Sequence, residues 1–173
     1  HRDIKPGNVL VDHNAQPKII DFGIAKVLDA ESVGVAAPWT ATHLQLLTPE
    51  YASPEQVRGL AIGHASDVYS LGVLLYELLT GSRPYLLAER SPVAIERTVC
   101  QSVPLDPSQQ LAAQTRLLPQ GLPEAGSLRR QLRGDLDRIV MTALRKEPEQ
   151  RFASAAELAA DLQRHLADRK SVV

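Results

Sequence analysis

Cysteine is nearly absent from this sequence, because Cys100 is the only one. A single cysteine excludes an intrachain disulfide, and no secretory signal pattern is present, so we expect a reducing, cytoplasmic location. Neither a histidine nor a second cysteine accompanies Cys100 at metal-ligand spacing. We therefore interpret Cys100 as a small buried apolar residue.

Long apolar runs and an excess of either charge are also missing. The best candidate for a membrane span, residues 68–79, contains Glu77 and is shorter than the roughly 20 apolar residues that a span needs. The 19 Lys and Arg residues nearly balance the 20 Asp and Glu residues, for a net charge of −1. This balance gives no reason to expect a nucleic acid or an anionic membrane as the partner.

What is present is a soluble, globular composition, with 44% hydrophobic and 23% charged residues in a chain of 173. That length suits one domain or one lobe of a larger domain. Two short β-branched runs, residues 9–11 and 18–20, are separated by turn-forming residues, which predicts a small hairpin. Residues 24–48 have no hydrophobic period and predict a long loop, a feature that is normally functional or disordered.

The strongest helical pattern lies in residues 66–79. Apolar residues recur there at helical spacing, namely Val68, Leu71, Leu74, Leu75 and Leu78. Gly81 follows the predicted end of the helix. Because apolar residues also occupy the other faces, this helix is predicted to be buried on all sides.

Further helices are predicted on either side of a connector. Residues 92–101 and 135–146 have helical patterns, and a last helix begins at Ser154, with Glu157 in the position of a capping box. Leu158, Leu162 and Leu166 are assigned to its inner face. Residues 103–126 contain repeated prolines among Gln, Ser and Ala, which predicts an exposed connector; we draw its boundary at residue 132. The result is a mostly α fold, with a short β-hairpin followed by a helical bundle.

The first segment with a chemical signature is residues 1–8, which read HRDIKPGN. Phosphoryl transfer needs a group that accepts a hydroxyl proton, a cation near the moving phosphoryl group and an oxygen ligand for Mg²⁺. Asp3, Lys5 and Asn8 can fill these roles in that order. Pro-Gly-Asn is also ordinary turn chemistry, so this segment alone leaves a plain surface turn as an equal alternative.

Two later segments decide between these alternatives. Residues 21–23, DFG, follow the second β-branched run directly, and residues 48–55 read TPEYASPE. Their order and separations match the protein kinase signature set. The whole chain resembles bacterial Ser/Thr protein kinases of the eukaryotic-like (Hanks) type, from the catalytic loop to the final helix. The resemblance implies the C-lobe of the protein-kinase-like fold, which is α+β as a whole.

The resemblance implies a role for each matching polar residue. Asp3 resembles the catalytic base, and Lys5 the lysine that steadies the transferred phosphoryl group and indicates Ser or Thr as acceptor. Asn8 and Asp21 resemble the two Mg²⁺ ligands, and with Lys5 they make up the expected contacts to ATP. Thr48 resembles the threonine that seats the acceptor residue.

Other matching residues resemble structural positions of the family. Asp67 resembles the aspartate that braces the catalytic loop, although a favourable charge at a helix start is an alternative. Glu55 and Arg151 resemble a glutamate–arginine pair that ties the activation segment to the helices. His1 and Phe22 resemble the lower half of a hydrophobic spine between the two lobes.

The activation segment is assigned to residues 21–55. Thr40 and Thr42 are predicted phosphorylation sites, because they form a Thr-x-Thr pair upstream of Thr48, and Arg2 is placed to pair with the phosphate. An unmodified polar loop is the alternative. The chain departs from the family at Leu47, where a glycine usually stands; a Cβ there disfavours positive φ, so the loop can be held differently.

The domain assignment is a partial kinase domain over residues 1–169 and a tail over residues 170–173. No Gly-rich phosphate loop is found, so we expect ATP- and Mg²⁺-dependent phosphorylation of protein Ser/Thr by a longer parent kinase, with this segment inactive alone. A truncated pseudokinase scaffold is the alternative. Candidate partners are protein substrates and a second kinase copy for phosphorylation in trans. Many relatives continue into a membrane span, so an anchor further along the parent protein stays open.

Overall fold

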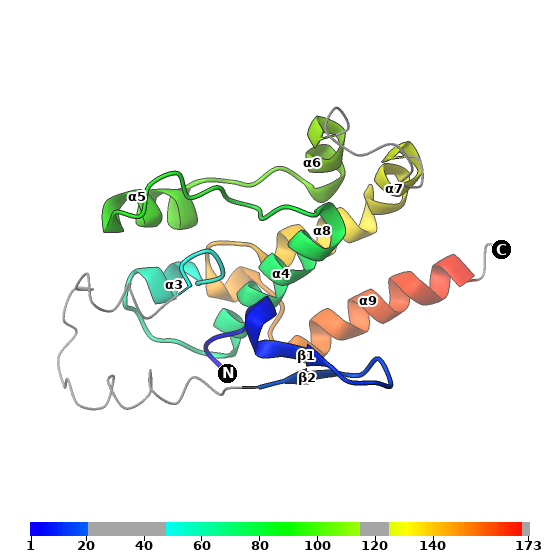
Figure 1. Cartoon of the computed structure of the whole chain (residues 1–173), viewed down its shortest axis with the longest axis horizontal. Helices are drawn as coiled ribbons and strands as arrows, with labels where there is room; N and C mark the ends of the chain where they lie inside the picture. Colours follow the sequence, from blue (N-terminus) through cyan, green and yellow to red (C-terminus); the bar gives the residue numbers. More distant parts are fainter. Residues whose placement is uncertain (21–47, 115–124, 171–173) are drawn as a thin grey trace.

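The computed structural model describes residues 1–20, 48–114 and 125–170. In these ranges the chain has the predicted mostly α fold, with one two-stranded antiparallel sheet. Figure 1 shows helices α4 (His64–Thr80) and α8 (Asp135–Ala143) in the middle of the molecule. Helix α9 (Ala155–Lys170) and the sheet lie on one side, and α5 (Pro92–Glu96) and α6 (Pro107–Gln114) on the other.

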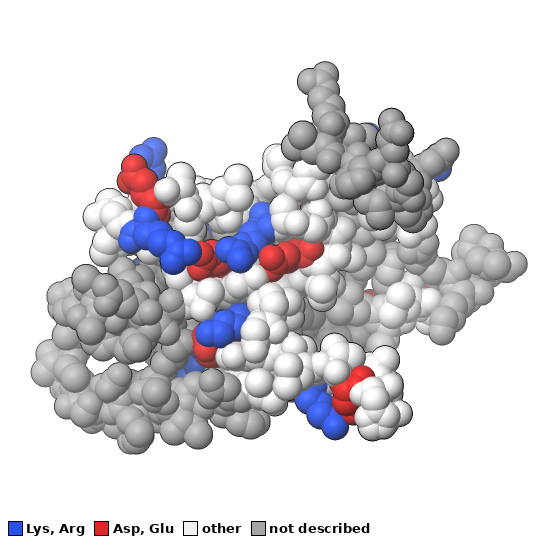
Figure 2. All heavy atoms as spheres, viewed as in Figure 1, with Lys and Arg blue, Asp and Glu red and all other residues white. Residues whose placement is uncertain are grey.

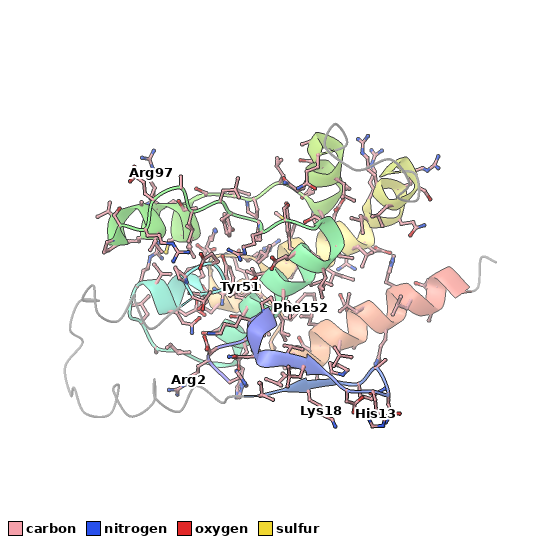
Figure 3. All side chains as sticks on the ribbon, viewed as in Figure 1. Arg2, His13, Lys18, Tyr51, Arg97 and Phe152 are labelled. Atoms are coloured by element: carbon pink, nitrogen blue, oxygen red, sulfur yellow. The ribbon has the colours of Figure 1, made fainter. Side chains whose placement is uncertain are left out.

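The predicted hairpin is confirmed. Strands β1 (Val9–Val11) and β2 (Pro17–Ile19) pair with Val9 opposite Ile19. The Asp12 carboxylate closes the turn, because it accepts hydrogen bonds from the backbone N–H groups of Asn14 and Gln16 at 2.9 and 3.0 Å. The bond from Gln16, then the Lys18 side chain and the bond from Asn14, lower the pKa of Asp12. Figure 3 shows Lys18 and His13 at the outer end of the hairpin, away from Arg2.

Helix α4 supplies the centre of the core. Tyr69, Val73 and Tyr76 are at most 1% exposed and lie on one face at helical spacing. Gly72 permits close approach to α8, since a Cβ at this position would lie 2.8 Å from Cβ of Ala143. Helix α4 also contacts α6 and α9. The other elements are therefore arranged around α4.

The prediction that α4 is buried on all sides was wrong. Leu78 is 75% exposed in the described part of the chain, and Leu71, Leu74 and Leu75 are only half-buried. The tightly packed face runs through the aromatic residues, whereas the leucines lie beside it or opposite. Hydrophobic periodicity counted the leucines and the aromatic residues together, so it could not tell which face the neighbouring helices cover.

The connector prediction was also wrong for part of its range. Helix α6 lies within residues 103–126, and Leu111 is 4% exposed on its inner side. The start of α6 is fixed by Asp137 of α8, which accepts hydrogen bonds from the backbone N–H and the hydroxyl of Ser108 at 2.9 and 2.6 Å. Helix α7 (Ala125–Leu132) contacts both α6 and α8. A tertiary contact therefore stabilises a segment whose prolines favoured a loop.

The remaining helices agree with the predicted ones, with small differences. Helix α5 continues into a π-helical turn, η2 (Arg97–Gln101), and a short 3-10 turn, η3 (Pro148–Gln150), leads towards α9. The hydroxyl of Ser154 accepts a hydrogen bond from the N–H of Glu157, as predicted, while the Glu157 carboxylate accepts one from Ala153. Leu158 is buried, but Leu166 is 58% exposed, so the inner face predicted for α9 was wrong at Leu166.

No helix in the described ranges is long and apolar enough to span a membrane.

Candidate active site

The three polar residues of the first segment meet at one carboxylate. The Lys5 Nζ lies 2.9 Å from Oδ2 of Asp3. The Asn8 Nδ2 donates to the backbone oxygen of Asp3 at 2.8 Å and to Oδ2 at 3.1 Å. A 3-10 turn, η1 (Pro6–Asn8), returns the chain to Asp3, and its first bond runs from the Asn8 N–H to the carbonyl of Lys5. The turn chemistry of Pro-Gly-Asn thus serves to assemble the cluster.

The members of this cluster differ in how far they are buried. The Asn8 residue is 7% exposed, whereas the side chains of Asp3 and Lys5 are 17% and 26% exposed. Asn8 therefore has a fixed position, whereas part of the Asp3 side chain reaches the surface. A carboxylate oxygen in this position has the chemistry to accept a proton.

Lys5 also links this loop to the segment that contains Thr48. Its Nζ donates a hydrogen bond to Oγ1 of Thr48 at 3.2 Å, across 43 positions in the sequence. One ammonium group therefore contacts both the proposed base and the residue expected to seat the acceptor. This contact brings together two motifs that the sequence analysis could relate only by their order.

Asp67, in the first turn of α4, holds the backbone on the other side of the loop. Its Oδ1 accepts a hydrogen bond from the Arg2 N–H at 2.8 Å, and its Oδ2 lies 2.7 Å from the amino nitrogen of His1. These contacts have the geometry expected for the residue that braces the loop. Arg2 needs such support because its φ of 69° lies in the left-handed region, which a residue with a Cβ rarely adopts.

Sequence reasoning missed a second contact to the same residue. Gln56, in the short helix α3 (Pro54–Val57), donates from Nε2 to the carbonyl oxygen of Arg2 at 2.9 Å. Its Oε1 accepts from the N–H of Ser53 at 2.9 Å, so the same amide closes a capping box. The spacing Ser53-x-x-Gln56 was the available signal. It predicts the cap but not the contact to Arg2.

The predicted ion pair between Glu55 and Arg151 is present and buried. Arg151 Nη1 and Nη2 lie 2.7 and 2.8 Å from the two carboxylate oxygens, and the side chains are 0% and 5% exposed for Arg151 and Glu55. Ser66 donates to the same carboxylate at 2.6 Å. Burial acts to raise the pKa of Glu55, but the hydrogen bonds from Arg151 and Ser66 outweigh it, and the pKa lies below its usual value.

The rest of the Arg151 guanidinium is satisfied by the backbone. It donates to the carbonyl oxygens of Arg145, Lys146 and Ala65 at 2.7 to 2.8 Å. It also lies over the ring of Tyr69, with 5.0 Å from the guanidinium carbon to the ring centre. Arg151 therefore joins α3, the start of α4 and the segment after α8.

A second network that the sequence did not reveal surrounds Tyr51. Its hydroxyl donates to the carboxylate of Glu77, which also lies 3.5 Å from Nε of Arg83. Glu50 lies 3.6 Å from Arg83 and 2.8 Å from Arg90. Burial, followed by the bond to Glu77, raises the pKa of Tyr51 to about 12. On the face shown in Figure 2, basic and acidic side chains lie next to one another in a row across the middle, and most of the described surface around them is uncharged.

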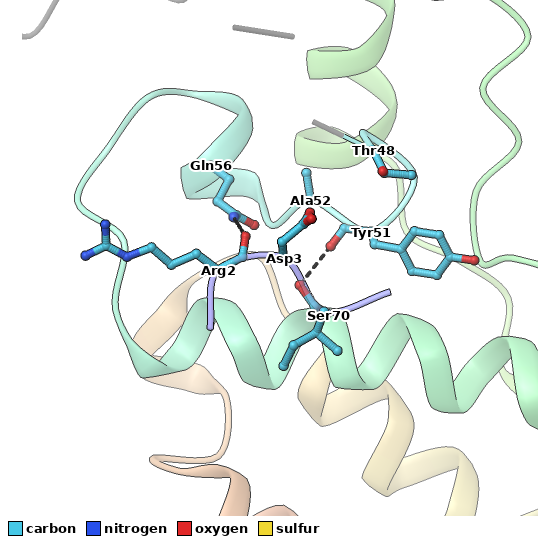
Figure 4. Close-up of a pocket in the computed structure, with 8 residues that line it drawn as sticks. Arg2, Asp3, Thr48, Tyr51, Ala52, Gln56 and Ser70 are labelled. Atoms are coloured by element: carbon cyan, nitrogen blue, oxygen red, sulfur yellow. Dashed lines mark hydrogen bonds between the residues drawn. The ribbon is translucent and has the colours of Figure 1, made fainter. Parts of the chain in front are cut away.

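A small cavity lies between residues 2–4 and the segment that contains Thr48 and α3. Its volume is about 10 Å³, and its lining includes Arg2, Asp3, Thr48, Gln56 and Ser70. Figure 4 shows the hydrogen bond from Gln56 to Arg2, and that from Ser70 to the carbonyl of Tyr51, at its edges. The cavity has room for about one water molecule and none for a nucleotide.

Several predicted site residues lie outside the described ranges. They are Asp21, Phe22, Thr40 and Thr42, and the departure at Leu47 lies there too. The structure therefore brings together Asp3, Lys5, Asn8 and Thr48, with Arg2 and Asp67 behind them. The role predicted for His1 in a hydrophobic spine stays a prediction, as do the roles of the residues outside these ranges.

Comparison with known proteins agrees with this geometry. Residues 1–163 match the protein kinase domain family. The chain belongs to this family. It is 40% identical over 162 residues to the serine/threonine-protein kinase PknB of Mycolicibacterium smegmatis, covering 94% of this chain and 22% of that protein. PknB of Mycobacterium tuberculosis strain H37Rv is 37% identical over 164 residues, with 95% and 22% covered. The chain thus spans about a fifth of the length of these relatives.

Proposed function

We propose that this chain carries the catalytic loop of an ATP- and Mg²⁺-dependent protein Ser/Thr kinase. The observation that carries the proposal is the position of Lys5, 2.9 Å from the Asp3 carboxylate and 3.2 Å from the Thr48 hydroxyl. An acceptor hydroxyl beside Thr48 would lie near both the base and the cation. The names of the PknB relatives support the same activity and the same acceptor class.

In this proposal each residue has one task. Asp3 accepts the proton of the substrate hydroxyl, and Lys5 neutralises charge on the phosphoryl group as it moves. Thr48 seats the acceptor residue. Because Asp67 and Asn8 fix the backbone on either side of Asp3, the base is positioned before the substrate arrives, which is where much of the rate of phosphoryl transfer arises.

The residues present fit a magnesium site in part. The Asn8 amide nitrogen is fixed by its two hydrogen bonds to Asp3, so the position of the amide oxygen is set as well, and such an oxygen is a ligand that Mg²⁺ accepts. Asp21 is the proposed second ligand. When bound, Mg²⁺ would neutralise part of the charge on the phosphates of ATP, and ATP would donate the phosphoryl group.

The family uses a nucleotide-binding lobe that contains a Gly-rich loop, and the 173 residues contain no such loop. We propose that residues 1–173 do not transfer phosphate without it. The term whole kinase denotes residues 1–173 together with a nucleotide-binding lobe. A protein substrate is the proposed acceptor of the phosphoryl group. For phosphorylation in trans, the proposed acceptor is a second copy of the kinase.

Activation by phosphorylation is proposed for Thr40 and Thr42, with Arg2 as the partner of the phosphate. Figure 4 shows the side chain of Arg2 directed away from Asp3. Among the described residues its guanidinium has no carboxylate within ion-pair distance. Mass spectrometry of active whole kinase should find phosphate on this pair; phosphate at other sites but never on Thr40 or Thr42 would remove the assignment.

The activity is tested with the whole kinase, Mg-ATP labelled at the γ-phosphate and a generic Ser/Thr protein. Label should appear on Ser or Thr, and Asp21→Ala should shift the Mg²⁺ titration of nucleotide binding to higher concentration. Absence of transfer, together with an unchanged Mg²⁺ titration, would instead favour a pseudokinase scaffold. Calorimetry of residues 1–173 alone with Mg-ATP should show no saturable binding.

A further inference from the structure

The Gln56 side chain makes a contact that its capping role does not require. It is 2% exposed, and its amide group is used at both ends. The oxygen accepts from Ser53 at 2.9 Å and closes the cap of α3, while the nitrogen donates to the Arg2 carbonyl at 2.9 Å, 54 positions away. The first bond is local to α3, whereas the second joins α3 to the catalytic loop.

The carbonyl that Gln56 holds belongs to the peptide group between Arg2 and Asp3. A peptide group is planar, so the direction of this carbonyl fixes the orientation of the Asp3 N–H and constrains the position of the Asp3 Cα, from which the side chain starts. The N–H of Arg2 is held by Asp67 at 2.8 Å. Gln56 and Asp67 thus hold Arg2 from its two ends, and between them they support a φ of 69°.

A small cavity lies beside the two residues that this peptide group joins. The cavity of about 10 Å³ is lined by Gln56, Arg2, Asp3 and Thr48, among others. Where neighbouring atoms leave such a space, hydrogen bonds decide the orientation of a backbone group more than contact does. The Nε2 of Gln56 is therefore placed to set the direction of the carbonyl.

We propose that Gln56 is a positioning residue for Asp3, an inference that rests on the proposed kinase function. It orients the Arg2–Asp3 peptide group through its amide nitrogen, and so directs the carboxylate of Asp3 towards the acceptor hydroxyl. It also connects α3, which carries Glu55 and its pair with Arg151, to the catalytic loop. The alternative is that Gln56 serves only the cap of α3.

Gln56→Glu separates the two roles with almost no change in shape. One carboxylate oxygen can still accept from Ser53, so the cap remains, but the ionised group has no hydrogen to donate to Arg2. Burial raises the pKa of a carboxyl group, and the protonated form regains a donor. The bond to Arg2 in this variant therefore depends on pH, whereas the cap does not.

The test compares kcat and KM of the wild-type whole kinase with those of Gln56→Glu at pH values from about 6 to about 8.5. At the alkaline end we expect kcat of Gln56→Glu to be about 10-fold lower than that of wild type. The KM for ATP should change little. As the pH falls, kcat of the variant should approach that of wild type. Ser53→Ala, which removes only the hydroxyl of the cap, should change thermal stability but not kcat. Equal kcat values for Gln56→Glu and wild type at every pH would overturn the proposal.

Two further measurements separate this inference from the kinase function itself. If Gln56→Glu does not fold, Gln56→Met keeps the volume and loses both bonds; a kcat equal to wild type in that variant would also overturn the proposal. The amide ¹⁵N resonance of Asp3 belongs to the peptide group that Gln56 holds and should titrate in Gln56→Glu but not in wild type. Wild type without transfer would end the proposed function, while this resonance would still show whether Gln56 orients the peptide group.

Discussion

Two ion pairs of nearly equal length perform different tasks in this chain. Lys5 and Asp3 are 2.9 Å apart with side chains 26% and 17% exposed, while Arg151 and Glu55 are 2.7 Å apart with side chains 0% and 5% exposed. Distance alone does not distinguish them. Their surroundings do, because Arg151 has carbonyl and carboxylate partners for its remaining donors, and Lys5 reaches towards Thr48.

The comparison teaches where charge is used for structure and where it is available for chemistry. A buried pair is stable only when every donor is satisfied, and then neither partner can easily change its contacts. A partly exposed pair contributes little to stability, but its members can meet a substrate. The chain places the first kind between α3 and the segment after α8, and the second kind at the proposed site of transfer.

Asp3→Asn should produce the largest effect and should affect activity rather than folding. The amide cannot accept the hydroxyl proton, and loss of a general base costs about 10²–10⁴-fold in rate. The hydrogen bonds within the loop need little change, so the unfolding midpoint should stay close to wild type. The measurement is kcat of the whole kinase with denaturation in urea beside it. More than about a tenth of wild-type turnover would contradict the role of Asp3 as base.

Arg151→Ala should have the opposite signature, a large loss of stability. It leaves the Glu55 carboxylate buried without its partner and frees several carbonyl groups, which typically costs about 3–5 kcal/mol. Urea denaturation measures the free energy of unfolding. Arg138→Ala is the matched control, because Arg138 lies in ion pairs with a side chain 60% exposed. A loss of less than about 0.5 kcal/mol for Arg151→Ala, the usual range for a surface change, would show that burial does not matter here.

Lys146 sharpens the comparison as a half-buried cation with neutral partners. Its Nζ donates to the Tyr85 hydroxyl at 2.6 Å and to the carbonyl of Val99 at 2.5 Å. Burial lowers the pKa of Lys146 to about 8 from 10.5. Above pH 8 the unfolded chain binds more protons at this position than the folded chain, so this group makes folding more favourable as the pH rises.

The difference in stability between wild type and Lys146→Met should therefore shift in favour of wild type from about pH 8 to pH 9. Below pH 8 the difference should be flat. Burial raises the pKa of Tyr85 to about 12 and also raises the pKa of Cys100. Neither side chain therefore loses its proton early in this pH range. A difference that stays constant across the window would contradict the lowered pKa of Lys146.

Lys5→Ala should have only a small effect on stability, within about 1 kcal/mol, because its pair is partly exposed. The same variant should reduce transfer by the whole kinase, since the cation beside the moving phosphoryl group is lost. Thermal unfolding and kcat are measured on one preparation. A large loss of stability with unchanged kcat would reverse the distinction between the two ion pairs.

Much of the site was determined by the sequence itself. The order and separations of HRDIKPGN, DFG and TPEYASPE were enough to recognise the family, because those residue types serve one reaction. The pair of Glu55 with Arg151 and the contact of Asp67 with the loop were predicted from the same resemblance, and the structure has both contacts. The hairpin and the longest helices followed from local hydrophobic patterns, which depend on neighbouring residues only.

Other features were decided by tertiary structure alone. Helix α6 forms in a proline-containing segment because Asp137 binds its first turn, and the packed face of α4 is the one that α8 covers closely at Gly72. The bond from Gln56 to Arg2 joins residues 54 positions apart, so no local pattern indicates it. The sequence determines which groups are available and how nearby residues fold. Which distant groups meet depends on how the helices pack, because hydrogen bonds and burial act through space and not along the chain.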